Sequence, residues 1–251
     1  MPVYWGSGLV LNQTEDELVK QTKSLIGQGF RAVKVRVGKP TVEEDERRLD
    51  AVVSELPDGA VLILDAVQGW SPEVAIRRSR RFERYQPLWL EDPLVHNDYP
   101  GLARVVNASP IPIATGENEY LREGFHQLLE IGVPYLLADL ERVGGILEWE
   151  AVAGAASMRS SVLTPHCYPH VAVQLCSTLQ QNQTWIEYVP FWDGLMRQQF
   201  DFSKGSISVP TTPGIGWDFD DRAVDRHAVA PWDSLLAPSP VVYLGGDRNR
   251  D

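Results

Sequence analysis

Three acidic side chains recur at equal spacing, each at the end of a short run of β-forming residues. Asp65 ends VLILD, Glu91 ends PLWLE and Glu117 ends IPIATGE, so that successive acids lie 26 residues apart. Equal spacing predicts equivalent positions on neighbouring strands, which lie about 4.8 Å apart in a sheet. Like charges this close are costly without a counter-ion. Because neither His nor Cys lies beside these acids in the sequence, we expect an all-oxygen site for Mg²⁺, with Mn²⁺ as the alternative.

For any single acid of this set, capping of the following helix is an equally good interpretation, since Asp and Glu are favoured at helix N-termini. Capping alone does not account for three acids that recur at the same spacing and at the ends of successive β-type runs. Asp92, next to Glu91, is interpreted as a supporting or capping group rather than a metal ligand.

Two cations lie on the segment AVKVRVG, which begins at Ala32. In a strand the side chains alternate, so Lys34 and Arg36 share one face and valines share the other. A strand that is covered on both sides carries cations only where they meet anions. We therefore expect Lys34 and Arg36 to face the carboxylates, the metal and an anionic substrate. The alternative is an edge strand with one solvated face.

An acid and an imidazole end the next two β-type runs. Asp139 ends PYLLAD and His166 ends SVLTPH. A carboxylate that accepts one ring N–H fixes the tautomer and raises the basicity of the other nitrogen, which makes His166 a candidate general base. Glu187, in the run TWIEYV, closes the ring of polar groups between His166 and Lys34.

These residues need a scaffold of alternating strands and helices. Eight β-type runs are spaced by about 25 residues, and they begin at Val3, Ala32, Ala60, Pro87, Ile111, Pro134, Ser161 and Thr184. The segments between them read as helices, with capping residues at Thr14, Thr41 and Ser71. Such alternation predicts parallel strands, and eight of them favour a closed β/α barrel whose active site lies at the C-terminal mouth. An open doubly wound sheet would carry a glycine-rich phosphate turn after its first strand, whereas GSGLVL lies inside a strand-like run.

Composition excludes several classes of protein. The chain has 251 residues, with 23 Lys and Arg against 34 Asp and Glu, a formal charge of −11. This balance argues against a nucleic-acid partner. With neither a membrane-length apolar run nor a signal peptide, we expect a cytoplasmic protein without a membrane partner. Cys167 and Cys176 are interpreted as buried thiols.

The expected domain organisation is a barrel over residues 1–190 followed by a C-terminal extension over residues 191–251. The extension is rich in Pro, Gly and Trp, and we expect it to pack on the barrel. The final stretch, GGDRNRD, is expected to be disordered.

Taken together, these motifs resemble the barrel domain of the enolase superfamily, in its mandelate racemase subgroup. The resemblance covers nearly all of the chain and rests on the order and spacing of KVR, LILDAVQGW, WLEDPL, ATGENEY, LADLERVGGI, TPH, WIEY and GSISVPTTPGIG. It implies a TIM-type (β/α)7β barrel, here without the N-terminal capping domain of the family.

The resemblance also implies roles for individual residues. The ligands of an essential Mg²⁺ match Asp65, Glu91 and Glu117. The dyad that moves the proton α to a carboxylate matches Asp139 and His166. The residues that hold and polarise the substrate carboxylate match Lys34 and Glu187. A Lys or His base that works beside Mg²⁺ is a known feature of this superfamily.

Three departures from the family pattern shape the expected reaction. The second lysine of the strand-two KxK motif is Arg36, whose guanidinium is a poor base. Val67 stands where the subgroup often has a polar residue. The capping domain that closes the mouth is absent from this chain, which affects water exclusion and substrate selection.

The leading hypothesis is therefore dehydration of a sugar acid to a 2-keto-3-deoxy acid, with His166 as base and then acid. One alternative is a racemase or epimerase of a 2-hydroxy acid. Another is a catalytically silent barrel that serves as a binding or assembly component. The expected partners are a small-molecule sugar acid and either a second copy of the chain or a separately encoded capping domain.

Overall fold

The computed structural model describes residues 1–179 and 184–228, in two compact units. The first unit comprises Met1–Pro190 and Phe200–Gly216, and it carries every candidate site residue. The second unit, as far as it is described, comprises Phe191–Gln199 and residues 217–228. The stretch GGDRNRD, expected to be disordered, lies outside the described residues.

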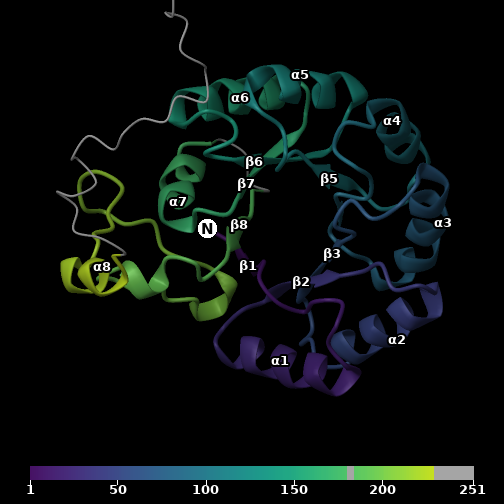
Figure 1. Cartoon of the computed structure of the whole chain (residues 1–251), viewed down its shortest axis with the longest axis horizontal. Coiled ribbons are helices and arrows are strands. Elements are labelled where there is room, and N and C mark those ends of the chain that lie inside the picture. The colour runs from purple at the N-terminus through teal and green to yellow at the C-terminus, as the bar shows by residue number, and fades with distance from the viewer. Residues whose placement is uncertain (180–183, 229–251) are drawn as a thin grey trace, which may run out of the picture. The chain divides into compact units, whose positions relative to one another are not determined.

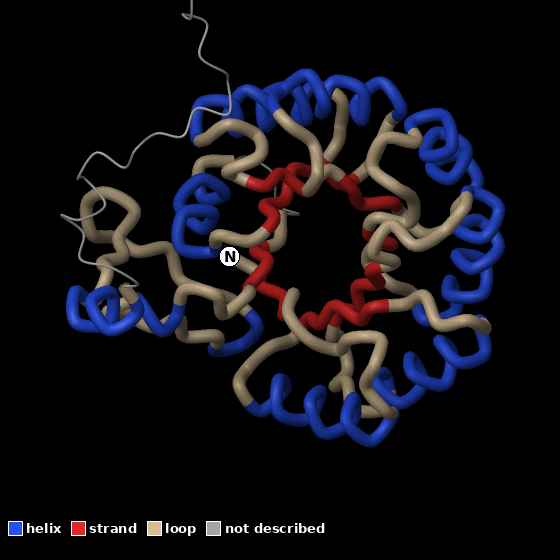
Figure 2. Tube along the Cα trace, viewed as in Figure 1, coloured by secondary structure: helices blue, strands red, loops and turns tan. Residues whose placement is uncertain are grey.

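The first unit is built on a ring of parallel strands surrounded by helices (Figures 1 and 2). The strand order is β7-β6-β5-β4-β3-β2-β1-β8. The strands are β1 (Val3–Trp5), β2 (Ala32–Arg36), β3 (Val61–Asp65), β4 (Leu90–Glu91), β5 (Ile113–Thr115), β6 (Tyr135–Asp139), β7 (Val162–His166) and β8 (Ile186–Tyr188). The helices between them are α1 (Glu15–Gly27), α2 (Val42–Val53), α3 (Pro72–Phe82), α4 (Tyr99–Ala108), α5 (Leu121–Ile131), α6 (Ile146–Met158) and α7 (Pro169–Ser177). The predicted (β/α)7β barrel is confirmed.

β7 and β8 are the two ends of the strand order, and threonine side chains form hydrogen bonds across the boundary between them, which we call the β7–β8 seam. The Thr164 hydroxyl donates to the Trp185 carbonyl at 2.8 Å and accepts from the Trp185 amide at 3.0 Å. The Thr184 hydroxyl donates to the Leu163 carbonyl at 3.0 Å. Pro165, in the middle of β7, has no N–H for a strand ladder. Side-chain hydroxyls therefore satisfy backbone groups at this seam.

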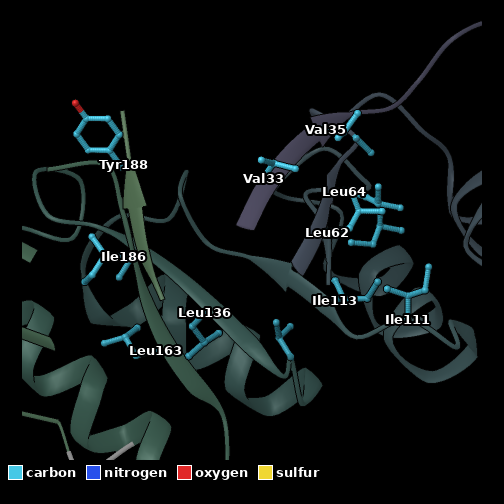
Figure 3. Close-up of a cluster of buried hydrophobic side chains, with 14 of the residues drawn as sticks. Val33, Val35, Leu62, Leu64, Ile111, Ile113, Leu136, Leu163, Ile186 and Tyr188 are labelled. Carbon is cyan, nitrogen blue, oxygen red and sulfur yellow. The ribbon is translucent and has the colours of Figure 1, made fainter. Parts of the chain in front are cut away.

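Strand residues alternate between two apolar clusters. One alternate set joins the large core that contains helix residues such as Leu18, Leu49 and Phe125. Figure 3 labels several of the strand residues in this core, among them Val33, Leu64 and Ile186. The other set forms a smaller cluster inside the barrel: Tyr4, Ala32, Ile63, Trp89, Ala114 and Leu137. Within it, the Tyr4 and Trp89 rings meet edge-on with centroids 5.6 Å apart. The predicted alternation in AVKVRVG is confirmed, because its three valines belong to the large core.

Several strands are shorter than the sequence pattern predicts. The first β-type run extends to Leu11, but β1 ends at Trp5, since Gly6 packs against the Glu187 side chain and Leu9 adopts a positive φ of 51°. A Cβ at Gly6 would lie 2.2 Å from Glu187 Oε1, so only glycine fits there. β5 ends at Thr115 rather than at Glu117.

Helix starts follow the expected capping chemistry. Thr14 with Glu17, and Thr41 with Glu44, form reciprocal capping boxes at α1 and α2. Ser71 caps α3 with Pro72 as its first residue. In the described part of the chain, none of the helices has the length and apolar character that a membrane crossing requires.

The segment Phe200–Gly216 packs within the first unit. Phe202 stacks on Phe30 with ring centroids 4.5 Å apart and lies at the same centroid distance from Tyr188. The Ile207 amide donates to the Met1 carbonyl at 2.9 Å. Residues far apart in the sequence thus cover the β8 side of the barrel.

Candidate active site at the C-terminal mouth

A layer of polar side chains lies next to the apolar cluster of the barrel interior. On most of these strands the polar residue is the next inward-facing residue toward the C-terminal end. Lys34 follows Ala32, Asp65 follows Ile63, and Glu91 follows Trp89, each by two residues. Asp139 likewise follows Leu137, and Glu187 is the register partner of Tyr4. Because strand side chains repeat with a period of two, the sequence that fills the barrel floor also places these groups at its mouth.

Lys34 is the cationic centre of this layer. Its Nζ donates to Glu187 Oε1 at 2.7 Å and to Glu91 Oε1, and it lies 3.8 Å from Asp65 Oδ2. The residue is 3% exposed. Burial lowers the pKa of Lys34, but the charges of Glu187 and Glu91 outweigh it and raise that pKa well above its usual value. Lys34 therefore stays charged and balances two buried carboxylates.

Arg36 lies at the outer end of β2, as the register partner of Asp65. Its Nε is 3.7 Å from Asp65 Oδ2, and its side chain is 41% exposed. Arg36 thus faces the carboxylates, as predicted, from a more open position than Lys34. The Asp65 carboxylate also accepts a hydrogen bond from the Val67 amide at 2.9 Å.

Glu91 is almost fully buried and lies directly beside Asp65 in the strand register. Its Oε2 accepts from Trp89 Nε1 at 3.0 Å, while its Oε1 accepts from Lys34. Burial, together with the charges of Asp65 and Glu187, raises the pKa of Glu91 well above its usual value despite Lys34. Burial is therefore the main influence on the pKa of Glu91, and Lys34 offsets only part of it.

Glu117 does not share the level of the other two acids. The register partner of Glu91 is Ala114, so Glu117 lies three residues further along, beyond the end of β5. Gly116 turns the chain with a φ of 129°. The expectation of three equivalent strand-end positions is wrong for Glu117, because equal sequence spacing does not fix the length of the intervening helix and loops.

Asp139 and His166 form the expected dyad. They are register partners on β6 and β7, and His166 Nδ1 lies 2.8 Å from Asp139 Oδ2. The other oxygen of Asp139 accepts from the amides of Glu141 and Arg142, each at 3.0 Å. Burial raises the pKa of Asp139, but the hydrogen bonds from His166 and from the Arg142 amide outweigh it and lower that pKa. An ionised Asp139 therefore holds the imidazole by Nδ1.

The free nitrogen of His166 points into a group of acids. Nε2 lies 3.2 Å from Glu117 Oε2 and 3.9 Å from Glu187 Oε2. Burial lowers the pKa of His166, yet the bonds to Asp139 and Cys167 and the charges of Glu187 and Glu117 raise it to about 12. The barrel thus brings His166 against Glu117, although no histidine lies beside the three acids in the sequence.

Glu187 links the lysine to the dyad. One oxygen accepts from Lys34, and the other accepts from the Cys167 amide at 3.0 Å. Burial raises the pKa of Glu187, but Lys34 and His166 outweigh it and lower that pKa. Cys176 is buried as predicted. The same prediction is wrong for Cys167, which is partly exposed beside His166.

Asp92 occupies the position expected of a supporting group. It accepts from the Thr115 hydroxyl at 2.6 Å and from the Gln68 amide at 3.3 Å. Burial and the charge of Glu117 raise its pKa to about 7. Asp92 therefore adds to the concentration of carboxyl groups between β3 and β5.

The carboxylates of the mouth fit a hard divalent cation in their chemistry. Asp65, Glu91 and Glu117 supply only oxygen donors, which Mg²⁺ prefers. Their oxygens are not gathered around one point, however, because Glu91 is turned to Lys34 and Trp89 while Glu117 is turned to His166. Binding one ion between them requires these side chains to exchange their present partners for the cation.

Comparison with known proteins defines the family. Residues 17–223 match the model of enolase C-terminal domain-like proteins, and the chain belongs to this family. The 3,6-anhydro-alpha-L-galactonate cycloisomerase of Streptomyces coelicolor is 31% identical over 91% of this chain. The L-talarate/galactarate dehydratase of Salmonella typhimurium is 31% identical over 88% of it.

Solved structures agree with this assignment. L-Talarate dehydratase from Polaromonas sp. JS666, complexed with Mg and L-glucarate, matches 90% of this chain with a TM-score of 0.85 and 30% identity. A racemase from Streptomyces coelicolor with bound magnesium matches with a TM-score of 0.84 and 30% identity over the same share. The predicted enolase-superfamily relationship is confirmed.

The chain is shorter than these relatives. It covers 63% of the cycloisomerase, 55% of the Salmonella dehydratase and 63% and 62% of the two solved chains. The shared part is the barrel, which contains the polar layer described above.

Two contributors to the site were missed in the sequence. Trp89 has a signal, because it precedes Glu91 by two residues and so shares its face. Cys167 has none, since it reaches the site only through a turn in which Cys167 and Tyr168 adopt positive φ values of 53° and 49°.

Proposed function

We propose that this chain carries the catalytic barrel of a Mg²⁺-dependent sugar-acid dehydratase, with Asp65, Glu91 and Glu117 as the metal ligands. The observation that carries the proposal is the His166–Asp139 contact of 2.8 Å, which holds the imidazole by Nδ1 and aims Nε2 at the acidic mouth. The dehydratases among the relatives support the same class of reaction.

In this proposal, His166 Nε2 removes the proton α to the substrate carboxylate. Such a proton is only weakly acidic, so the negative charge that develops on the substrate must be stabilised by groups already in place. Lys34 supplies a fixed positive charge for this purpose, and Glu187 fixes the position of Lys34. A bound Mg²⁺ supplies Lewis-acid stabilisation of the same charge.

His166 then serves as the acid. The imidazolium gives its proton to the departing β-hydroxyl, which leaves as water, and the resulting enol tautomerises to a 2-keto-3-deoxy acid. Asp139 stays ionised and stabilises the imidazolium throughout. A cation held by Glu117 would reduce the negative charge beside His166, and the neutral imidazole that the first step needs would then be favoured.

A racemase or epimerase is the second candidate, favoured by the likeness to the Streptomyces coelicolor racemase. Racemisation needs a base on each face of the planar intermediate. Arg36 stands where the opposite base would be, and a guanidinium stays protonated in proteins. One-sided chemistry by His166 therefore fits these residues better.

Substrate, partners and location complete the proposal. A small sugar-acid carboxylate fits the cations at the mouth, and a capping domain or a second copy of the chain would cover that mouth. We place the protein in the cytoplasm. The third candidate is a silent barrel that acts as a binding or assembly component, which Arg36 favours because a guanidinium is a poor base.

The test is a panel of sugar acids incubated with Mg²⁺ and the chain, with and without the N-terminal capping domain of a dehydratase relative. Formation of a keto acid from one or more substrates supports the proposal. An epimer of unchanged mass supports the racemase instead. If calorimetry at millimolar Mg²⁺ shows no binding and the panel yields no product, the silent barrel is the correct interpretation.

A further inference from the structure

Three side chains at the mouth form a group with a different ligand chemistry from the carboxylates. His166, Cys167 and Glu187 offer nitrogen, sulfur and oxygen atoms that lie within 4.8 Å of one another. Nitrogen and sulfur ligands are typical of zinc sites, whereas Mg²⁺ prefers oxygen. The proposed dehydration uses no thiol, so the role of Cys167 is unassigned by that chemistry.

Two of the three distances within this group are close to those around a tetrahedral ion. Cys167 Sγ lies 3.5 Å from His166 Nε2, and Glu187 Oε2 lies 3.9 Å from the same nitrogen. Zinc bonds of about 2.3 Å to sulfur and about 2.0–2.1 Å to nitrogen and oxygen set ligand separations of about 3.6 Å and 3.4 Å at tetrahedral angles. The sulfur and nitrogen are thus already at the required separation, and the carboxylate needs to approach by about half an ångström.

Supporting contacts orient two of the three ligands. Asp139 holds His166 Nδ1, which leaves Nε2 as the nitrogen that faces the group and that binds the ion once it gives up its proton. A carboxylate on the other ring nitrogen is the usual support of a zinc-bound histidine. Lys34 engages Oε1 of Glu187 and leaves Oε2 on the side of His166 and Cys167.

We propose that His166, Cys167 and Glu187 form a second metal site that takes a borderline-soft divalent cation such as Zn²⁺, separate from the carboxylate site for Mg²⁺. When the ion binds, the Cys167 thiol and the His166 imidazolium each release a proton to solvent. Binding needs no turnover and does not rest on the proposed function. The effect of the ion on catalysis does rest on the proposed function. An ion bound to His166 Nε2 prevents this nitrogen from removing the α-proton, so Zn²⁺ inhibits the dehydration.

Cobalt reports this site directly, because a Co²⁺–thiolate bond gives a charge-transfer absorption that a carboxylate site does not. The probe is Co²⁺ added to the full chain, followed by competition with Zn²⁺. Wild type is compared with Cys167→Ser and with Cys176→Ser, a matched control that removes the buried thiol of α7. Asp65→Asn tests independence from the carboxylate site, and circular dichroism checks that each variant is folded.

We expect the absorption in wild type, Cys176→Ser and Asp65→Asn, displaced by Zn²⁺. In Cys167→Ser it disappears, and the affinity for Zn²⁺ falls by at least about tenfold. Absence of the band in folded wild type, its loss in Cys176→Ser instead, or unchanged Zn²⁺ affinity in Cys167→Ser would overturn the proposal. A cobalt band without keto-acid production from any substrate rejects the proposed function and leaves the second metal site intact.

Discussion

Asp139 and His166 are register partners on adjacent parallel strands, with Oδ2 and Nδ1 2.8 Å apart. Because β6 and β7 are paired along their whole length, the backbone fixes this relationship before any ligand binds. Asp139 is further held by two backbone amides. The dyad is therefore rigid, whereas the carboxylates opposite it must change partners to bind a cation.

Replacement of the buried Lys34 should lower the free energy of unfolding, because the carboxylates around it would lose their counter-charge. Lys34→Met leaves Glu91 and Glu187 without their shared cation, and removal of one partner from a buried ion pair costs about 3–5 kcal/mol. Urea unfolding at neutral pH measures the loss. Lys23→Met is the matched control, because Lys23 pairs with Glu55 at the surface with a side chain 63% exposed. Its effect should stay below about 1 kcal/mol, and equal losses in the two variants would contradict this account.

The hydrogen bonds at the β7–β8 seam predict that a nearly isosteric substitution, Thr164→Val, lowers the free energy of unfolding. Thr164→Val removes the hydroxyl that serves both the amide and the carbonyl of Trp185. Both hydrogen bonds are part-buried, and each is worth about 0.5–1.5 kcal/mol net, so the free energy of unfolding should fall by about 1–3 kcal/mol. Thr178→Val is the control, since Thr178 is exposed and its hydroxyl donates to the Leu175 carbonyl within the same helical turn. Chemical denaturation that ranks Thr178→Val as the more damaging change would refute the role of the seam.

The loop after β3 contains a strained residue, Val67, whose substitution should stabilise the fold. Val67 is 50% exposed and adopts a φ of 49°, in the left-handed region that β-branched residues avoid. Asparagine tolerates this conformation, so Val67→Asn should raise the free energy of unfolding by about 1 kcal/mol. Val53→Asn, at an exposed helical position of α2, should give no gain. A thermal or urea midpoint for Val67→Asn at or below that of wild type contradicts the prediction.

Helix capping predicts a pH-dependent contribution to stability. Hydrogen bonds from Thr14 and Thr41 lower the pKa values of Glu17 and Glu44 below their usual value of 4.5. A carboxyl whose pKa is depressed on folding stabilises the fold above its unfolded pKa, and that stability is lost as the pH falls through the folded pKa. Thr14→Ala with Thr41→Ala should therefore destabilise the chain more at pH 7 than in acid. Urea midpoints at both values measure this difference, and a constant difference would rule out the linkage.

The fold and most of the site follow from short-range patterns in the sequence. A period of two in AVKVRVG and VLILD places charges on one face and apolar side chains on the other. Asp139 and His166 end neighbouring runs, so parallel pairing alone brings them together. These features depend on local alternation and strand order, which a sequence records directly.

Other features depend on loop geometry and on competition between side chains. Equal spacing predicts Glu117 level with Glu91, but Gly116 turns the chain beyond the end of β5. The sequence could not show that Glu91 would be turned to Trp89 and Lys34. Cys167 enters the site through a backbone conformation that cysteine seldom adopts, for which its neighbours give no local signal.

The central claim is that His166 moves the α-proton of a bound carboxylate, and proton exchange in deuterated water tests it without requiring loss of water. Wild type and His166→Asn are compared with Mg²⁺, the capping domain and the sugar acid that gives product, and calorimetry confirms that both bind Mg²⁺. We predict that His166→Asn slows exchange at the α-carbon by about 10²–10⁴-fold while metal binding persists. Exchange at the wild-type rate in His166→Asn would contradict the claim.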